Sequence, residues 1–306
     1  MPKLNIYSIE VLSKKSWVPI GFFLNWKDWK AHPRKSYFYD HKDSDKEKWK
    51  YIRVVKDWTL MKRLHIWLWD ELSKFDSELP KSINWWVSQK SILNAINIHI
   101  RNMDCCFVKS DLSRFFESIP RERTFSLFCK IFNCSKEVSE VLTNCITFPI
   151  WPLWSESEEI TLARWLHVSS RIAIWASIDF FRLLETKIFE NYNELNPRIS
   201  YYVDDIWISL ITSDIPTVNS FVTYLKSFLE KECPNLGFLS LHPKKTEYHF
   251  LNTEDNYVDY LWARIYKNHK DVSLKWIQKS LDSTEKASLL KKIISRKQFR
   301  MRLKSN

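Results

Sequence analysis

The chain has 306 residues, and 45% of them are hydrophobic, which excludes a disordered protein and allows a large buried core. Lys and Arg outnumber Asp and Glu by 47 to 36, and the resulting net charge of +11 favours a polyanionic partner such as nucleic acid. No apolar run reaches the roughly 20 residues of a membrane-spanning helix and the first residues form no signal pattern, so we expect a cytoplasmic protein without a membrane partner.

Hydrophobic periodicity and helix-boundary residues predict a chain that mixes helices and strands. In chain order, we expect a strand at 5–12, helices at 57–75 and 88–99, a strand at 107–111, helices at 122–132 and 136–145, one or two helices within 161–191, two short strands within 199–210, and a helix at 215–231. From Arg264 onward the chain is basic, with apolar residues at helical spacing. This tail is expected to be helical, either as a nucleic-acid contact or as a solvated surface helix.

Two adjacent carboxylates, Asp204 and Asp205, stand between β-branched and aromatic residues in the segment 199–210. This pattern predicts two strands joined by a tight turn, with both acids at its tip. Neighbouring carboxylates repel each other, and a divalent cation would remove that repulsion. Oxygen-only ligands favour Mg²⁺, with Mn²⁺ as the alternative. A second explanation stays open, because solvated hairpin tips often carry Asp for turn formation.

A third acid, Asp111, falls at the end of the apolar strand predicted at 107–111, and a helix start is predicted after it at Ser113. One strand-end carboxylate and a pair on a hairpin tip are what a two-metal phosphoryl-transfer site requires. One ion would activate the attacking 3′ oxygen and the other would hold the triphosphate, about 3.5–4 Å away. Taken alone, Asp111 could instead be a helix N-cap, which stabilises a helix by about 1 kcal/mol. Together the segments predict that Asp111, Asp204 and Asp205 hold two Mg²⁺ ions.

These two segments resemble the reverse transcriptases. Tyr202-Val-Asp-Asp205 is similar to their Tyr-x-Asp-Asp motif, and residues 111–119, Asp-Leu-Ser-Arg-Phe-Phe-Glu-Ser-Ile, are similar to their preceding aspartate motif. The second motif looks most like that of bacterial antiphage-defence enzymes, namely the abortive-infection, retron-like and unknown-group reverse transcriptases. Weaker likenesses at 91–99 and 243–246 extend the resemblance to roughly residues 35–265.

The resemblance implies an α+β, right-hand polymerase fold of fingers, palm and thumb, with an antiparallel palm sheet backed by helices. It divides the chain into fingers at 1–104, a first palm part at 105–134, fingers and palm helices at 135–195, a second palm part at 196–250, and the palm end with a basic helical thumb at 251–306. It implies RNA-directed addition of deoxynucleotides to a 3′ end in bacterial antiphage defence. The implied partners are an RNA template or non-coding RNA, the DNA product and dNTPs; a homo-oligomer and a partner defence protein stay open.

The resemblance also assigns roles to individual residues. The Leu112 carbonyl would add a metal ligand, and Lys245 would donate a proton to the leaving pyrophosphate. Phe116 would be the steric gate that rejects a ribose 2′-OH, while Tyr202 would pack beside the primer end or in the core. Further nucleotide contacts are expected from Lys50, Arg53, Ser170 and Arg171. Phosphate contacts of the thumb are expected from Lys291, Lys292, Arg296, Lys297 and Arg300.

One element of the family is missing. The reverse transcriptases have a Pro-x-Gly segment between the two motifs, and its glycine lets the backbone approach the template and the incoming nucleotide. The corresponding stretch here, 163–173, contains neither glycine nor proline and keeps only a serine-arginine end. Template-independent or protein-primed DNA synthesis therefore stays open. Two further alternatives stay open as well, an RNA-synthesising polymerase and a non-catalytic, polymerase-like RNA-binding scaffold.

Overall fold

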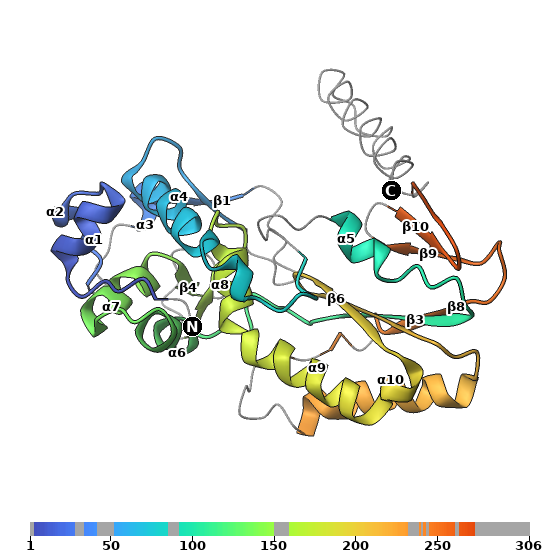
Figure 1. The fold of residues 1–306 in the computed structure, drawn as a ribbon. Helices are drawn as coiled ribbons and strands as arrows, with labels where there is room; N and C mark the ends of the chain where they lie inside the picture. Colours follow the sequence, from blue (N-terminus) through green and yellow to red (C-terminus); the bar gives the residue numbers. More distant parts are fainter. Residues whose placement is uncertain are drawn as a thin grey trace, which may run out of the picture.

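The computed structural model describes residues 3–27, 34–41, 52–84, 92–149, 159–231, 239, 241–242, 245–260 and 263–272. These residues form helices and antiparallel sheets in two groups, which lie side by side in Figure 1. One group is mainly helical, and the other is built on a four-stranded sheet. Within the described ranges, none of the helices combines the length and the apolar character that crossing a bilayer requires.

The elements follow one another along the chain with these bounds. The α-helices are α1 Ile9–Ser16, α2 Ile20–Leu24, α3 Arg34–Tyr37, α4 Leu60–Ser73, α5 Ile92–Asn97, α6 Arg121–Ser126, α7 Lys136–Asn144, α8 Ser169–Ala176, α9 Ile178–Tyr192 and α10 Ile215–Lys231. The strands are β1 Phe38–Asp40, β2 Arg53–Val55, β3 Cys105–Asp111, β4 Thr147–Pro149, β5 Ile160–Leu162, β6 Arg198–Tyr202, β7 Asp205–Leu210, β8 Glu247–Leu251, β9 Tyr257–Tyr260, β10 Ala263–Tyr266 and β11 Lys270–Val272.

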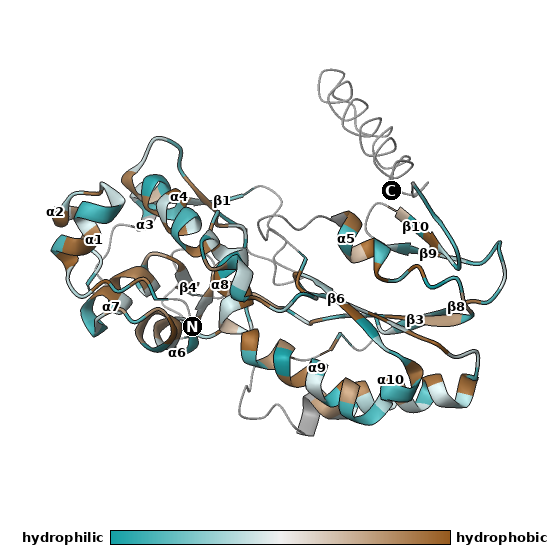
Figure 2. Cartoon of the chain, in the orientation of Figure 1, coloured by the Kyte–Doolittle hydropathy of each residue, from teal (hydrophilic) through white to brown (hydrophobic). Residues whose placement is uncertain are grey.

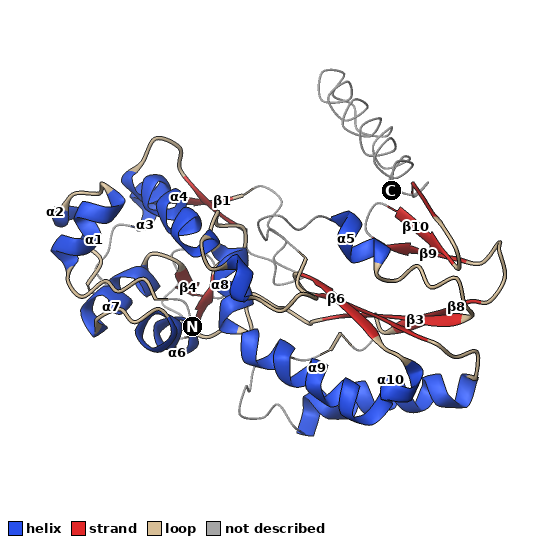
Figure 3. Ribbon diagram, viewed as in Figure 1, coloured by secondary structure: helices blue, strands red, loops and turns tan. Residues whose placement is uncertain are grey.

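The main sheet has the strand order β6-β7-β3-β8, and every neighbouring pair is antiparallel. Its side chains alternate between the two faces, as the two-residue period of a strand requires. Phe107 and Trp207, with ring centroids 5.1 Å apart, share a buried cluster with α5 and the small sheet β9-β10-β11. Val108 and Ile208 belong to the cluster on the opposite face, which α9 and α10 cover (Figures 1 and 3). Burial on both faces makes this sheet a rigid support.

Helix α10 shows how the sequence produces this packing. Its residues Val218, Phe221 and Leu225 are buried, and their spacing of three and four places them on one face of the helix. Figure 2 shows the mixture of hydrophobic and hydrophilic positions along α10. At its N-terminus, the Asp214 carboxylate accepts a hydrogen bond from the Thr217 N–H at 2.9 Å. The cap fixes where the helix begins, and the apolar face fixes what it covers.

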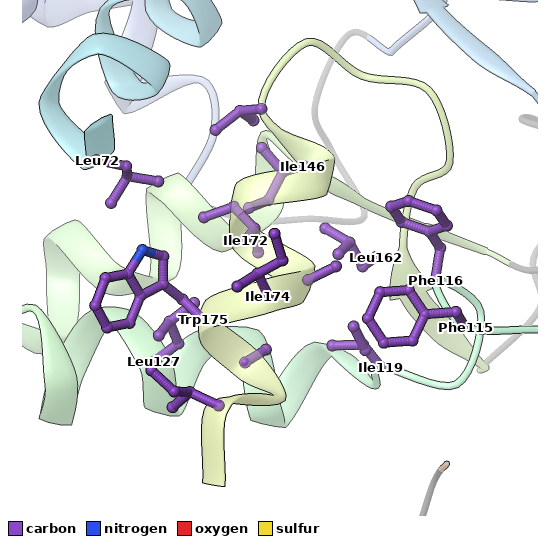
Figure 4. Packing of buried hydrophobic residues seen from close by; sticks show 14 of the residues in the cluster. Leu72, Phe115, Phe116, Ile119, Leu127, Ile146, Leu162, Ile172, Ile174 and Trp175 are labelled. Carbon is purple, nitrogen blue, oxygen red and sulfur yellow. The ribbon is translucent and has the colours of Figure 1, made fainter. Parts of the chain in front are cut away.

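The helical group contains the short sheets β1-β2 and β4-β5 and a core rich in aromatic residues. The Trp175 and Phe132 rings are both buried and meet edge to face, with centroids 5.8 Å apart. Figure 4 shows part of this core around Trp175. The same cluster includes Val108 and Ile208 of the main sheet. The two groups of elements therefore share one continuous core.

The structure confirms the predicted elements that have a long periodic pattern. The predicted helices at 57–75, 88–99, 122–132, 136–145 and 215–231 correspond to α4, to α5 in its described part, to α6 with the following π-helix Leu127–Ile131, to α7 and to α10. The strand predicted at 107–111 is β3, and those within 199–210 are β6 and β7. A repeated apolar face specifies these elements locally, which is why the sequence alone predicts them.

The strand predicted at 5–12 is wrong, because this segment leads into helix α1. The Ser8 hydroxyl accepts a hydrogen bond from the Val11 N–H at 3.3 Å and caps the helix. Ile9 and Leu12, three residues apart, are then buried on the same face. The cap residue outweighs the short apolar alternation.

The helix predicted to start at Ser113 is also wrong. The chain turns there because Arg114 adopts a left-handed conformation with φ 50°, and α6 begins only after Pro120. Within 161–191, the first residues form strand β5 and a loop before α8 and α9.

The basic tail is corrected in its first part, since strands β10 and β11 occupy it up to Val272 in place of a helix. The basic helix predicted beyond that point lies outside the described residues.

Candidate active site

The two adjacent acids lie at the tip of a hairpin, as predicted. Strands β6 and β7 pair with Tyr202 opposite Asp205, which leaves Val203 and Asp204 as a two-residue loop. Val203 has φ 62°, a conformation that is rare for a β-branched residue. Such strain costs about 1–3 kcal/mol and persists only where the surrounding contacts impose it. The sheet therefore holds the tip in a strained shape.

The third acid, Asp111, lies beside this tip. Strand β3 is the neighbour of β7, and Asp111 pairs in register with Asp205. The Leu112 N–H donates to the carbonyl of Asp204 at 2.7 Å, which fixes the end of β3 against the loop. Residues directly opposite each other in an antiparallel pair have Cβ atoms roughly 4.5–5.5 Å apart. Asp111, Asp204 and Asp205 thus form one group, the carboxylate cluster.

Burial and mutual repulsion both act on the carboxylate cluster. Burial raises the pKa of Asp205 to about 7, and the charges of Asp204 and Asp111 add to the shift, while Lys109 and Lys245 oppose it. Burial also raises the pKa of Asp204, again with a contribution from Asp111. Like charges opposite each other destabilise an antiparallel pair. An arrangement that the folded state keeps despite this repulsion is typical of a functional site.

A lysine approaches the cluster from the segment before β8. The His242 N–H donates to the carbonyl of Asp111 at 2.7 Å, and the Lys245 N–H donates to the carbonyl of His242 at 3.1 Å. This turn brings Lys245 Nζ to 3.1 Å from Asp111 Oδ2. The Lys245 side chain is 54% exposed, so it can leave the ion pair at little cost. Lys245 is therefore at the cluster, and its role as a proton donor stays a prediction.

The carboxylate cluster fits a divalent cation by the chemistry of its donors. They are all carboxylate oxygens, which Mg²⁺ and Mn²⁺ prefer, and burial disfavours the ionised forms of Asp204 and Asp205. Among the residues that the structure describes, however, no three His, Cys, Asp or Glu side chains form a ready-made metal site. Asp111 is instead paired with Lys245. Binding of an ion would require Lys245 to move and the three carboxylates to turn toward one point; the Leu112 carbonyl stays a predicted further ligand.

The remaining predicted contacts have varied positions. Phe116 is 7% exposed and packs edge to face on Phe115, with both rings at one side of the core drawn in Figure 4. Tyr202 is partly exposed opposite Asp205, and Ser170 is partly exposed in the first turn of α8. Their roles as gate, primer contact and nucleotide contact stay predictions. Outside the described residues lie Lys50, Lys291, Lys292, Arg296, Lys297 and Arg300.

Two predicted nucleotide contacts are arginines that lie in the interior. Arg171 forms an ion pair with Asp76 at 2.6 Å, with side chains 5% and 4% exposed, and its guanidinium lies 4.1 Å from the Trp69 ring centroid. Arg53, on strand β2, is 2% exposed and pairs with Asp40 at 2.7 Å. Both guanidinium groups are engaged in holding the helical group together. Their roles as nucleotide contacts stay predictions, and each would require the arginine to leave its buried ion pair.

An arginine-glutamate pair beside the cluster was missed by the sequence analysis. Arg164 Nε and Nη2 donate to the two oxygens of Glu117 at 2.8 and 2.7 Å, and the guanidinium lies 5.6 Å from the Phe116 ring centroid. Burial lowers the pKa of Arg164, but the hydrogen bond and charge of Glu117, with the charges of Asp204 and Asp111, raise it overall. The sequence feature that could have predicted this pair is the carboxylate of Glu117, which directly follows the predicted steric gate Phe116.

A buried polar network fixes the hairpin away from its tip. The His99 ring nitrogens lie 3.0 Å from Ser209 Oγ and 2.8 Å from Ser200 Oγ, and Ser200 Oγ lies 2.9 Å from the Tyr260 hydroxyl. Burial lowers the pKa of His99 to about 3, and the charge of Arg101 adds to the effect. Because Ser200 is on β6 and Ser209 on β7, a neutral imidazole joins the two strands of the hairpin.

Comparison with known proteins gives only distant matches. No protein-family model matches the sequence, and no curated protein does. The structure is similar to that of apo telomerase from Candida tropicalis truncated from the C-terminal domain, with a TM-score of 0.46 and 11% identity, covering 73% of this chain and 52% of that chain. It is also similar to telomerase from Candida albicans in complex with a TWJ fragment of telomeric RNA, with a TM-score of 0.47 and 8% identity, covering 73% and 44%. The chain spans about half the length of these telomerase structures. Similarities of this size carry no conclusion about function.

Proposed function

We propose that the protein is a reverse transcriptase-like DNA polymerase that adds deoxynucleotides to a 3′ end on an RNA template, and that it acts in bacterial antiphage defence. The observation that carries the proposal is the meeting of three acids from two distant segments. Asp111 stands in register with Asp205, and the Leu112 N–H bonds the carbonyl of Asp204. The resemblance of both segments to reverse transcriptase motifs favours nucleotide addition over other uses of an acidic cluster.

The proposal gives the fold a right-hand polymerase arrangement. The main sheet would be the palm, the helical group the fingers, and the chain beyond residue 251 the end of the palm and the thumb. In support, β3 begins at Cys105, the expected start of the palm, and β6 and β7 lie within the second palm part at 196–250. Helices α9 and α10 back the sheet on the face expected of a palm (Figure 1).

The described residues divide the work of the reaction among them. Divalent ions bound at the carboxylate cluster would supply the charge that activates the 3′ hydroxyl and holds the triphosphate. Lys245, released from Asp111, would donate a proton to the leaving pyrophosphate. Phe116 would exclude a ribose 2′-OH by contact with the sugar, and Tyr202 would pack beside the primer end. The rigid sheet would keep these groups in a fixed relation, so that little reorganisation accompanies the reaction.

Incorporation of labelled dNTPs in the presence of RNA and Mg²⁺ tests the proposal. The Asp204→Ala, Asp205→Ala variant should lose at least about 100-fold in rate, because it removes the ligands that hold charge at the reacting phosphate. Asp179→Asn is the matched control, since this α9 carboxylate is 54% exposed and pairs with Arg123 away from the cluster. Circular dichroism verifies the fold of each variant. Equal incorporation by the wild type and the double-alanine variant would reject the polymerase.

A second candidate is synthesis without a template or from a protein primer. The stretch that lacks the family's glycine has its backbone occupied by internal hydrogen bonds. The Ala163 N–H donates to Ile146, the Ala163 carbonyl accepts from Ser169 Oγ at 2.5 Å, and the Arg164 carbonyl accepts from the Arg53 N–H at 3.2 Å. Sequencing the product separates the two, because complementarity to a bound RNA excludes template independence. A double-alanine variant that still protects cells from phage would instead favour the non-catalytic scaffold.

A further inference from the structure

Arg164 lies in the stretch that lacks the family's glycine element, and its backbone is fixed on both sides. Its carbonyl accepts the Arg53 N–H at 3.2 Å, and the Ala163 N–H before it donates to the Ile146 carbonyl at 3.0 Å. An isolated bridge joins Ile52 to Arg164 as well. The Arg164 side chain therefore extends from a backbone position that neighbouring strands hold in place.

The guanidinium of Arg164 is oriented by a bidentate ion pair. Glu117 accepts from Nε and Nη2 at 2.8 and 2.7 Å, and the two side chains are 20% and 9% exposed. Paired parallel hydrogen bonds of this kind set the plane of the guanidinium as well as its position. That plane lies over the Phe116 ring, 5.6 Å from its centroid. Since Phe116 and Glu117 are consecutive, one turn of the chain supplies both groups that hold the cation.

The pair leaves part of the Arg164 donor capacity unused. Glu117 takes Nε and Nη2, and among the described residues no group accepts a hydrogen bond from Nη1. The charges of Asp204 and Asp111 also act on the Arg164 guanidinium, so the cation lies near the carboxylate cluster. A guanidinium with unused donors can bind a phosphate group, and divalent cations that accompany the phosphate would offset its repulsion from the nearby acids.

We propose that Arg164, positioned by Glu117, binds the triphosphate of the incoming nucleotide next to the steric gate. This inference rests on the proposed function and adds a residue to it. The side-chain donors of Arg164 replace the close backbone approach that the family's glycine allows. Glu117 is a positioning residue, because it sets the guanidinium plane and does not itself contact an anion.

Equilibrium binding of dTTP and dTMP in Mg²⁺, followed by titration calorimetry, tests the assignment. Arg164→Ala should weaken dTTP binding about 10- to 100-fold, the range expected when charge-assisted hydrogen bonds to phosphate are lost. The loss should be smaller for dTMP, which carries one phosphate. Arg164→Lys keeps the charge but not the fork, so it should fall between the wild type and alanine. Glu117→Gln should weaken dTTP binding about 3- to 10-fold through loss of orientation.

Controls separate this inference from a structural effect and from the proposed function. Arg182→Ala, at an exposed arginine of α9, should bind dTTP as the wild type does. Equal weakening of dTTP and dTMP by Arg164→Ala would indicate a purely structural role and overturn the inference. The inference would also be overturned if Arg164→Ala bound dTTP normally but RNA weakly, because Arg164 would then contact the template. If the wild type incorporates dNTPs and neither Arg164→Lys nor Arg164→Ala changes the KM for dTTP, the inference about Arg164 is rejected and the polymerase proposal is not. If the wild type binds no dTTP, both are rejected.

Discussion

Arg164 and Arg171 come from the same segment of the chain and make the same two kinds of contact, yet they serve different parts of the molecule. Arg164 pairs with Glu117 at 2.7 Å, and Arg171 pairs with Asp76 at 2.6 Å. Each guanidinium also lies over an aromatic ring, at 5.6 and 4.1 Å from the centroid. Contact type alone therefore does not distinguish the buried Arg171 from Arg164, which we propose as a phosphate-binding residue.

Their surroundings separate them. The Arg171 and Asp76 side chains are 5% and 4% exposed, so this pair is sealed in the helical core. Arg164 is 20% exposed, and the charges of Asp204 and Asp111 reach it. A sealed pair contributes to folding, whereas a cation at an open, acid-rich edge can still bind a ligand. Accessibility and unbalanced charge nearby, rather than the ion pair itself, therefore indicate a candidate site.

The largest effect on stability is expected from a substitution that breaks the buried pair of Arg171 and Asp76. Arg171→Ala leaves Asp76 as an uncompensated buried charge and should lower the free energy of unfolding by about 3–5 kcal/mol. Arg164→Ala should lower it by only about 1–2 kcal/mol, because the Arg164 side chain is 20% exposed and water that enters its place can hydrate Glu117. Urea denaturation followed by circular dichroism measures both. Equal losses for the two variants would contradict the comparison.

The carboxylate cluster is predictable from the sequence because the information that specifies it is local. An apolar strand ending at Asp111 and a hairpin turn at Asp204 and Asp205 are both patterns of a few residues, and antiparallel pairing then has few ways to join them. The sequence predicts a nucleotide contact from Arg171 and singles out no role for Arg164, which we propose as the phosphate-binding residue. Their partners are fixed by contacts 95 and 47 residues away along the chain. No local pattern contains that information.

The fold shows the same division between local and distant information. Helix α10 was predicted with its full bounds because its apolar positions repeat over many turns. The segment 5–12 was mistaken for a strand, because a few apolar residues fit either period and the Ser8 cap decided the outcome. Strand β5, three residues long, pairs with β4 and carries no periodic signal of its own. Short elements of this kind are specified by their neighbours.

The pH dependence of stability tests the role of His99, which is buried between the two strands of the hairpin away from its tip. The pKa of His99 is lowered to about 3, mainly by burial, so the unfolded chain, with a histidine pKa near 6.5, binds the proton more readily. The stabilising effect of neutral His99 is therefore present above pH 6.5 and is lost as the pH falls toward 3. Each pH unit in this window should cost about 1.4 kcal/mol through His99.

The measurement is urea denaturation at pH 7, 6 and 5 for the wild type and His99→Gln. The glutamine can still reach the Ser200 and Ser209 hydroxyls but does not titrate, so its stability should fall less steeply with acid, by about 1.4 kcal/mol per pH unit. Asp205 has a pKa that burial and the neighbouring acids raise, so its protonation in acid stabilises the folded state and works in the opposite direction. Because Asp205 is present in both proteins, its contribution cancels in the difference. If the free energies of unfolding of the two proteins changed in parallel with pH, His99 would not be buried as a neutral imidazole in the folded state.

The smallest expected effect concerns the strain stored at the tip. Val203 has φ 62°, which an alanine tolerates poorly and a glycine adopts freely. Val203→Gly and Val203→Ala both remove the valine packing, so their difference isolates the backbone. The glycine variant should be the more stable by about 1 kcal/mol. At an ordinary strand position, with negative φ, alanine would instead be favoured by about 0.5–1 kcal/mol. Thermal or urea denaturation measures this difference in stability. A more stable glycine variant would show that the turn at Val203 is strained, and a more stable alanine variant would show that it is not.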